Sequence, residues 1–262
     1  MYKHHEESIQ NLINYFSNRE EIIAVILGGS VAKGVAREDS DIDAMIIVTE
    51  EYYAERVKSN TVVECIGSMC TYEGGYFDLK YYTKDFIRTT SKIGSEPARN
   101  AFLGAYALFS KDPEIPGIVA SIPIFQEQDM SKKLLSFYSS LSLHYHYFWP
   151  LTKDNPYMKI RAAAEISYCC YRIILQENKL LFPCNRRLEE AVAKAPNKPE
   201  DILLLGQEFL TKLDDESVKK FVEATTNWMT YIPPKDYSEI LTCYTKDYEL
   251  WWKEARPLVN EW

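Results

Sequence analysis

Apolar and polar positions alternate with two different periodicities along the chain. The change from one periodicity to the other divides the sequence into two parts. Up to about residue 115, short apolar runs of strand length are separated by glycine turns and polar segments. Beyond that region, apolar positions recur at three- and four-residue steps over long stretches, as in helices that bury one face. The pattern therefore predicts an α+β fold, with an N-terminal β-sheet and its flanking helices followed by a C-terminal helical bundle.

The individual elements follow from the same periodicities. In the first part, helices are predicted at 5–18, 49–59, 85–93 and 97–108, and strands at 22–27, 41–48, 61–66, 69–72 and 76–83, the last two as a hairpin around a glycine turn. In the second part, six helices are predicted, at 130–149, 156–177, 187–195, 199–213, 217–231 and 237–255. Pro116, Gly117 and Pro123 cluster between the two parts. We therefore expect two domains, residues 1–120 and 121–262.

The stretch 22–48 reads IIAVILGGSVAKGVAREDSDIDAMIIV, two apolar runs around a Gly-Gly-Ser turn and an Asp-x-Asp pair. Side chains alternate faces along a strand, so Asp41 and Asp43 project to the same side. Carboxylates held side by side repel each other unless a cation neutralises them, and Mg²⁺ prefers oxygen ligands. The glycines let the backbone approach a ligand closely, so that amide groups and the Ser30 hydroxyl can face phosphate oxygens. The stretch thus predicts a metal and a phosphate bound together.

A third acidic residue lies inside an apolar, aromatic strand further along the chain. Asp78 stands in the run FDLKYYT, where an unpaired carboxylate would be costly. It either pairs with a lysine or arginine on a neighbouring strand or completes an acidic cluster with Asp41 and Asp43, and we prefer the cluster. Glu64 and Glu73 are weaker candidates, because each lies near a predicted strand end or turn.

Together these features resemble the signature of the DNA polymerase β-like nucleotidyltransferase superfamily. The segments that carry the resemblance are Gly29-Ser30, Lys33-Gly34 and Ser40-Asp41-Ile42-Asp43. The resemblance implies an N-terminal nucleotidyltransferase domain built on a mixed β-sheet. It also implies that one or two Mg²⁺ ions assist the reaction of a nucleoside triphosphate.

The same resemblance assigns roles to individual residues. Asp41, Asp43 and Asp78 are expected to be catalytic and to hold the metal, and Asp78 could instead accept the proton of the attacking hydroxyl. Contacts to the triphosphate are expected from Gly28, Gly29, Ser30, Lys33, Ser40, Arg186 and Arg187, and either arginine could instead contact the acceptor. The last two follow Leu181-Phe182-Pro183, in a segment that lies near the cleft in relatives with a helical second domain.

The two-part layout is similar to that of small-molecule nucleotidyltransferases such as the aminoglycoside adenylyltransferases. This likeness implies transfer of AMP from ATP to a hydroxyl of a small acceptor, with the helical domain as the other wall of the cleft. A net charge of −8 and a pI near 5.2 suit a cationic, aminoglycoside-like antibiotic and disfavour long nucleic acid. Two alternatives stay open: modification of a protein or RNA, as in antitoxin-like nucleotidyltransferases, and a non-catalytic nucleotide-binding regulatory module.

The helical half offers one further polar feature. Glu165 follows an alanine-rich run that otherwise has the composition of a buried helix face. It would either contact the substrate or form an intrahelical salt bridge with Arg161 or a neighbour. The sequence does not separate these two possibilities.

Nothing in the sequence points to a membrane. The N-terminus, MYKHHEESIQ, is polar, and eighteen apolar residues never run together. We therefore expect a soluble, cytoplasmic protein, and the oligomeric state stays open.

Overall fold

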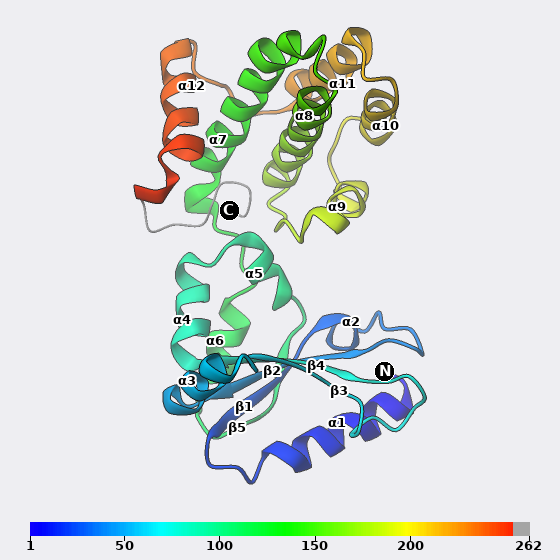
Figure 1. Cartoon of the computed structure of the whole chain (residues 1–262), viewed down its shortest axis with the longest axis vertical. Helices are drawn as coiled ribbons and strands as arrows, with labels where there is room; N and C mark the ends of the chain where they lie inside the picture. Colours follow the sequence, from blue (N-terminus) through cyan, green and yellow to red (C-terminus); the bar gives the residue numbers. More distant parts are fainter. Residues whose placement is uncertain (254–262) are drawn as a thin grey trace. The chain divides into compact units, whose positions relative to one another are not determined.

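The computed structural model describes residues 1–253 and divides the chain into two compact units, Met1–Ile124 and a second that starts at Phe125 (Figure 1). The first unit is a five-stranded sheet with helices on both faces, and the described part of the second unit is helical. The predicted α+β class is confirmed. The division after Ile124 lies just beyond α6 (Ile115–Ser121), whereas the predicted boundary at residue 120 falls inside that helix.

The sheet of the first unit has the strand order β3-β4-β2-β1-β5. Its strands are β1 (Ile22–Leu27), β2 (Ile42–Val48), β3 (Val63–Ile66), β4 (Phe77–Thr83) and β5 (Tyr106–Ser110). β2 and β4 are parallel, and every other neighbouring pair is antiparallel. The sheet is therefore mixed, and a crossover through α3 (Glu50–Ser59) and β3 joins its two parallel strands.

Helices cover both faces of this sheet. On one face, side chains of β2 such as Ile42 and Ile46 pack with α1 (Lys3–Phe16) and α3. On the other, Met45 and Ile47 pack with α4 (Lys84–Ile93), α6 and Phe102, which directly follows α5 (Glu96–Ala101). Since residues alternate along a strand, Asp43 belongs to the same face as Met45 and Ile47.

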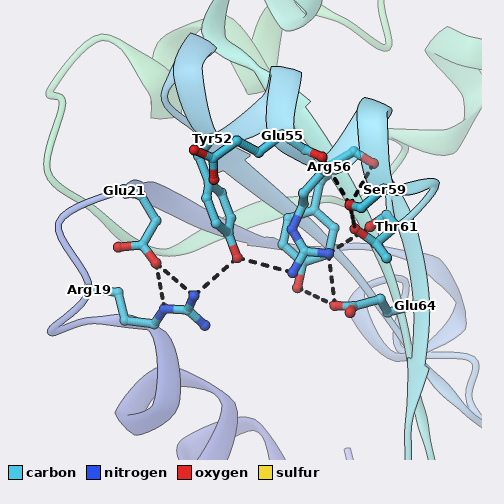
Figure 2. A network of polar contacts seen from close by, with 9 residues as sticks. Arg19, Glu21, Tyr52, Glu55, Arg56, Ser59, Thr61 and Glu64 are labelled. Atoms are coloured by element: carbon cyan, nitrogen blue, oxygen red, sulfur yellow. Dashed lines mark hydrogen bonds and ion pairs between the residues drawn. The ribbon is translucent and has the colours of Figure 1, made fainter.

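A polar network fixes α3 to the first of these faces (Figure 2). The Arg56 guanidinium donates to the Thr61 carbonyl at 2.6 Å and to the Tyr52 hydroxyl at 3.1 Å, and it lies 3.5 Å from the centroid of the Tyr81 ring. Glu64 pairs with Arg56 at 3.1 Å and accepts a hydrogen bond from Tyr81 at 2.7 Å. Glu64 is therefore engaged in this network, on the face of the sheet that the Tyr81 side chain occupies.

Two predicted elements of the first unit are wrong. No strand forms at 69–72, because β4 takes β3 as its antiparallel partner and the Tyr72 hydroxyl turns to donate to the Ser40 carbonyl at 2.7 Å. The helix predicted at 97–108 ends with α5, since Gly104 adopts a φ of 72° that reverses the chain into β5. The edge strand β5 was missed for this reason.

The second unit is organised around α8, as its packing shows. Its α-helices are α7 (Met130–Leu143), α8 (Pro156–Glu177), α9 (Leu188–Lys194), α10 (Ile202–Lys212), α11 (Asp215–Trp228) and α12 (Tyr237–Tyr244). Each lies within one of the six predicted helices or overlaps it. The first and last predicted helices run on as π-helical turns, His144–Phe148 and Thr245–Glu249, and residues 254–255 lie outside the described part. Within residues 1–253, no helix is both long and apolar enough to cross a membrane.

Candidate active site

Two of the predicted carboxylates are neighbours across the parallel strand pair. Asp43 on β2 is in register with Asp78 on β4, and register partners in a parallel pair project to the same face. Asp41 comes just before β2, where the Tyr76 hydroxyl donates to its Oδ2 at 3.0 Å. The structure therefore gathers the three predicted carboxylates at one edge of the sheet.

The glycine turn lies directly against Asp43. The Gly28 amide donates to the Asp43 carbonyl at 2.9 Å. Gly29 adopts a φ of 62°, and a Cβ at this position would overlap the Asp43 carboxylate. Both properties require glycine, so the turn and the acidic strand form one packed unit.

A cavity of about 300 Å³ opens beside these residues. Its polar end is lined by Gly28, Gly29, Lys33, Asp43, Asp78 and Lys80, and its apolar end by Met45, Tyr82, Phe86 and Phe102, together with small side chains of α5. The Tyr82 and Phe86 rings stack in parallel, with centroids 4.0 Å apart and an angle of 6° between their planes. The cavity therefore offers charged groups at one end and an aromatic surface at the other.

Lys80 supplies a positive charge inside the acidic site. It stands two residues after Asp78 on β4, hence on the same face, and its Nζ lies 3.2 Å from Asp78 Oδ2. Burial alone would lower the pKa of Lys80, but the carboxylates of Asp78 and Asp43 outweigh that effect and raise it. The lysine partner that the sequence left open for Asp78 thus exists, on the same strand rather than across the sheet.

At Asp43, by contrast, burial and the neighbouring carboxylates act in the same direction. Burial raises the pKa of its carboxyl group, and the negative charges of Asp41 and Asp78 raise it further. Lys80 and Lys33 oppose this effect without cancelling it. Burial and the neighbouring carboxylates thus both disfavour the ionised form of Asp43, and a bound cation would oppose this effect.

The donor chemistry suits Mg²⁺, because the three carboxylates offer hard oxygen ligands. Among residues 1–253, however, no three His, Cys, Asp or Glu side chains are arranged so that they could hold a metal ion. Asp78 turns its Oδ2 to the Lys80 ammonium. As the side chains stand, the three carboxylates therefore do not form a ready metal site.

Several other predicted residues do not line this cavity. The Ser30 side chain is partly buried in the short helix α2 (Gly29–Ala32), and the Ser40 Oγ accepts the Arg37 amide at 2.9 Å. Arg186 and Arg187 are exposed on a 3₁₀ turn of the second unit. Their assignment to the triphosphate stays a prediction.

The loop that leads to Asp41 is held by contacts that the sequence did not indicate. His4 Nε2 lies 2.9 Å from the Glu38 carbonyl oxygen, and the Tyr72 hydroxyl bonds the Ser40 carbonyl. The His4 and Tyr72 rings are 4.5 Å apart, beside His5, which is fully buried. The first turn of α1 thus helps to hold the loop that precedes Asp41.

Glu165 is buried on α8. The Ser140 hydroxyl donates to its Oε1 at 3.2 Å, and the Cys169 thiol lies 3.9 Å from the same oxygen. In the described part of the chain, Glu165 forms no ion pair with Arg161, so the predicted intrahelical salt bridge is absent.

Comparison with known proteins finds a family match within the first unit. The family model described as "Polymerase beta, Nucleotidyltransferase" matches residues 10–87, a span that contains the glycine turn and all three carboxylates. Among solved structures, the chain is similar to a nucleotidyltransferase-like protein from Exiguobacterium sibiricum 255-15, with a TM-score of 0.48 and 9% identity over 97% of this chain and 81% of that chain. No curated protein matches.

Proposed function

Because residues 10–87 belong to the DNA polymerase β-like nucleotidyltransferase superfamily, we propose that this protein transfers a nucleoside monophosphate from a nucleoside triphosphate to a hydroxyl of a small molecule. ATP is the expected donor, and pyrophosphate is released. One observation carries the proposal: Asp43 and Asp78 are in register on adjacent parallel strands, at a cavity whose wall includes the Gly28-Gly29 turn.

Each residue of the predicted site has a proposed role. One or two Mg²⁺ ions held by Asp41 and Asp43, with Asp78 as a further ligand, would stabilise the charge that develops on the transferred phosphoryl group. The Gly28-Gly29 backbone and Lys33 would receive the phosphates. Further contacts to the triphosphate are proposed for Ser30, Ser40, Arg186 and Arg187.

The reaction is a displacement at the α-phosphorus. A bond forms between the acceptor oxygen and this phosphorus, and the bond from phosphorus to the pyrophosphate oxygen breaks. The hydroxyl proton passes to a base, for which Asp78 is the candidate when it does not bind the metal. The aromatic end of the cavity, with Tyr82 and Phe86, would take a flat ring of one substrate.

The acceptor is proposed from charge. A protein with a net charge of −8 attracts cations, so an aminoglycoside-like acceptor is favoured over a long nucleic acid, whose phosphates it would repel. A protein or RNA end as acceptor would use the same carboxylates. The two kinds of acceptor differ in the size of the product that carries the label.

The test is to incubate the protein with Mg²⁺, each nucleoside triphosphate in turn and a panel of aminoglycosides and other hydroxylated molecules, and to measure pyrophosphate. We expect release with at least one acceptor, and its loss in Asp43→Asn. Asp39→Asn is the matched control, because Asp39 is exposed and paired with Arg37, so release should persist. No release with any acceptor, together with no Mg²⁺-dependent binding of triphosphate, would contradict the proposal.

Two further readouts separate the alternatives. Labelled ATP incubated with size-fractionated cell extract would reveal a protein or RNA acceptor as a labelled macromolecule. Triphosphate binding without pyrophosphate release in either experiment would identify a regulatory module.

A further inference from the structure

The acidic site contains a cation of its own. Lys80 projects from the same face of β4 as Asp78 and contacts its carboxylate at 3.2 Å, at the polar end of the cavity. Through the β2–β4 register, Asp78 stands opposite Asp43, whose charge also acts on Lys80. The ammonium group therefore offsets part of the negative charge where a metal would have to bind.

Stability alone does not account for this arrangement. The side chains of Lys80 and Asp78 are 42% and 25% exposed, and ion pairs with this much contact with water contribute little to folding. In addition, a lysine stem has enough rotatable bonds to reach other partners inside the cavity. The pair is thus poised to separate when a stronger ligand for either charge arrives.

We propose that Lys80 is an exchangeable counter-cation, which holds Asp78 in the free protein, yields it to the divalent metal, and then turns to the phosphates of the bound triphosphate. The proposal rests on the proposed function, since it takes the metal and the triphosphate from it. It adds a residue that the family signature does not contain, and it explains why the three carboxylates are not preformed as a metal site.

The exchange makes binding of the two ligands cooperative. Metal alone must displace Lys80 and leave its ammonium without a carboxylate, so metal alone binds weakly. The triphosphate gives the displaced ammonium a new partner, so each ligand strengthens the binding of the other, by the same factor in both directions. Removal of the Lys80 charge should strengthen binding of the metal alone and weaken this coupling.

The experiment measures binding in the full chain without turnover. Mn²⁺ binding is followed by electron paramagnetic resonance, and binding of an α,β-methylene triphosphate analogue by calorimetry in EDTA. In Lys80→Met, which keeps most of the stem, we expect Mn²⁺ to bind about ten-fold more tightly, because a positive charge near the carboxylates is gone. The analogue should bind about ten-fold more weakly. Lys58→Met, an equal charge change on the exposed side of α3, should alter neither affinity.

A second variant changes the carboxylate partner of Lys80 instead of the lysine. Its result does not depend on how Lys80→Met folds. Asp78→Asn removes the carboxylate that holds Lys80, so in EDTA the analogue should bind more tightly while Mn²⁺ binds more weakly. Unchanged Mn²⁺ affinity in Lys80→Met, or unchanged analogue affinity in Asp78→Asn, would overturn the role of Lys80. Failure of the proposed function gives a different result, in which Asp41→Asn binds Mn²⁺ as well as the wild type does.

Discussion

At the scale of single residues, the site depends on the contact between the glycine turn and Asp43. The Asp43 carboxylate occupies the space that a Cβ at position 29 would need, and the φ of Gly29 is one that other residues rarely adopt. Position 29 thus controls both the fold of the turn and the orientation of a carboxylate.

Gly29→Ala should lower the free energy of unfolding by ~2 kcal/mol, through strain at positive φ and displacement of the Asp43 side chain. It should also abolish Mn²⁺ binding. Chemical denaturation and electron paramagnetic resonance measure the two effects. Gly34→Ala is the matched control, because Gly34 has a φ of 72° but open space around its Cβ position. It should cost about 1 kcal/mol and leave Mn²⁺ bound. Equal effects of both variants on Mn²⁺ would show that strain alone matters.

Asp43→Asn should stabilise the protein at pH 7 while it abolishes turnover. Burial and the neighbouring carboxylates raise the pKa of Asp43 in the folded state, so its ionised form destabilises the fold at neutral pH. The gain should be ~0.5 kcal/mol, a typical value for a relieved repulsion between like charges on neighbouring strands. It should shrink as the pH falls toward the ordinary aspartate value of 3.8 and vanish below it. Thermal unfolding from pH 3 to 8 without metal measures this, and a gain that grows as the pH falls would contradict it.

The sequence could predict the carboxylates but not all of their surroundings. Alternation along a strand placed Asp41 with Asp43, and a charged residue in an apolar strand singled out Asp78. The same alternation puts Lys80 and Tyr82 on the face of β4 that carries Asp78, so the sequence contains the signal for both. Phe86, on α4, reaches the cavity through tertiary packing, which no local pattern encodes.

At the scale of elements, one buried arginine joins the helices that cover the site's face of the sheet. Arg99 on α5 is 1% exposed and donates to the carbonyls of Ser91 and Gly94, near the end of α4, and to those of Ile122 and Ile124 after α6. Three helices are thus tied together through their C-terminal ends.

Arg99→Met should lower the free energy of unfolding by ~3 kcal/mol, because buried carbonyl groups lose a charged donor. Denaturant titration measures the loss. Arg88→Met on α4 is the control, since the Arg88 side chain is 47% exposed and pairs with Glu114 at the surface. It should change stability by less than about 1 kcal/mol. Similar losses in both variants would contradict a special role for Arg99.

At this scale, the sequence did not predict which strands pair with β4. The apolar run before β4 resembled a hairpin with a Gly-Gly turn, but β4 pairs with β3 and β2, and residues 69–72 cover the loop before Asp41 instead. Partners that are distant in sequence are chosen by which faces become buried, and local turn residues do not determine this.

At the scale of the whole molecule, the cavity belongs to the first unit alone. Every residue that lines it lies before Ile124, where the first unit ends. Each unit also has a hydrophobic core of its own. The helical periodicity of the second half predicted its helices well, whereas the sequence holds no pattern that positions one unit against the other.

Residues 1–124 expressed alone should fold and bind Mn²⁺ with the affinity of the full chain, because all three carboxylates and Lys80 belong to this unit. Circular dichroism and electron paramagnetic resonance test this, with Asp41→Asn in the same fragment as the control. A folded fragment that does not bind Mn²⁺ would show that the second unit supplies a ligand.

The parallel pairing of β2 with β4 also sets an order of events during synthesis. Asp78 follows Asp43 by 35 residues, and a ribosome that adds 5–20 residues per second takes about 2–7 s to cover that length. During this interval the nascent chain carries the first two aspartates without the third and without Lys80. The acidic site therefore cannot assemble before β4 has been translated, because Asp78 and Lys80 lie on that strand.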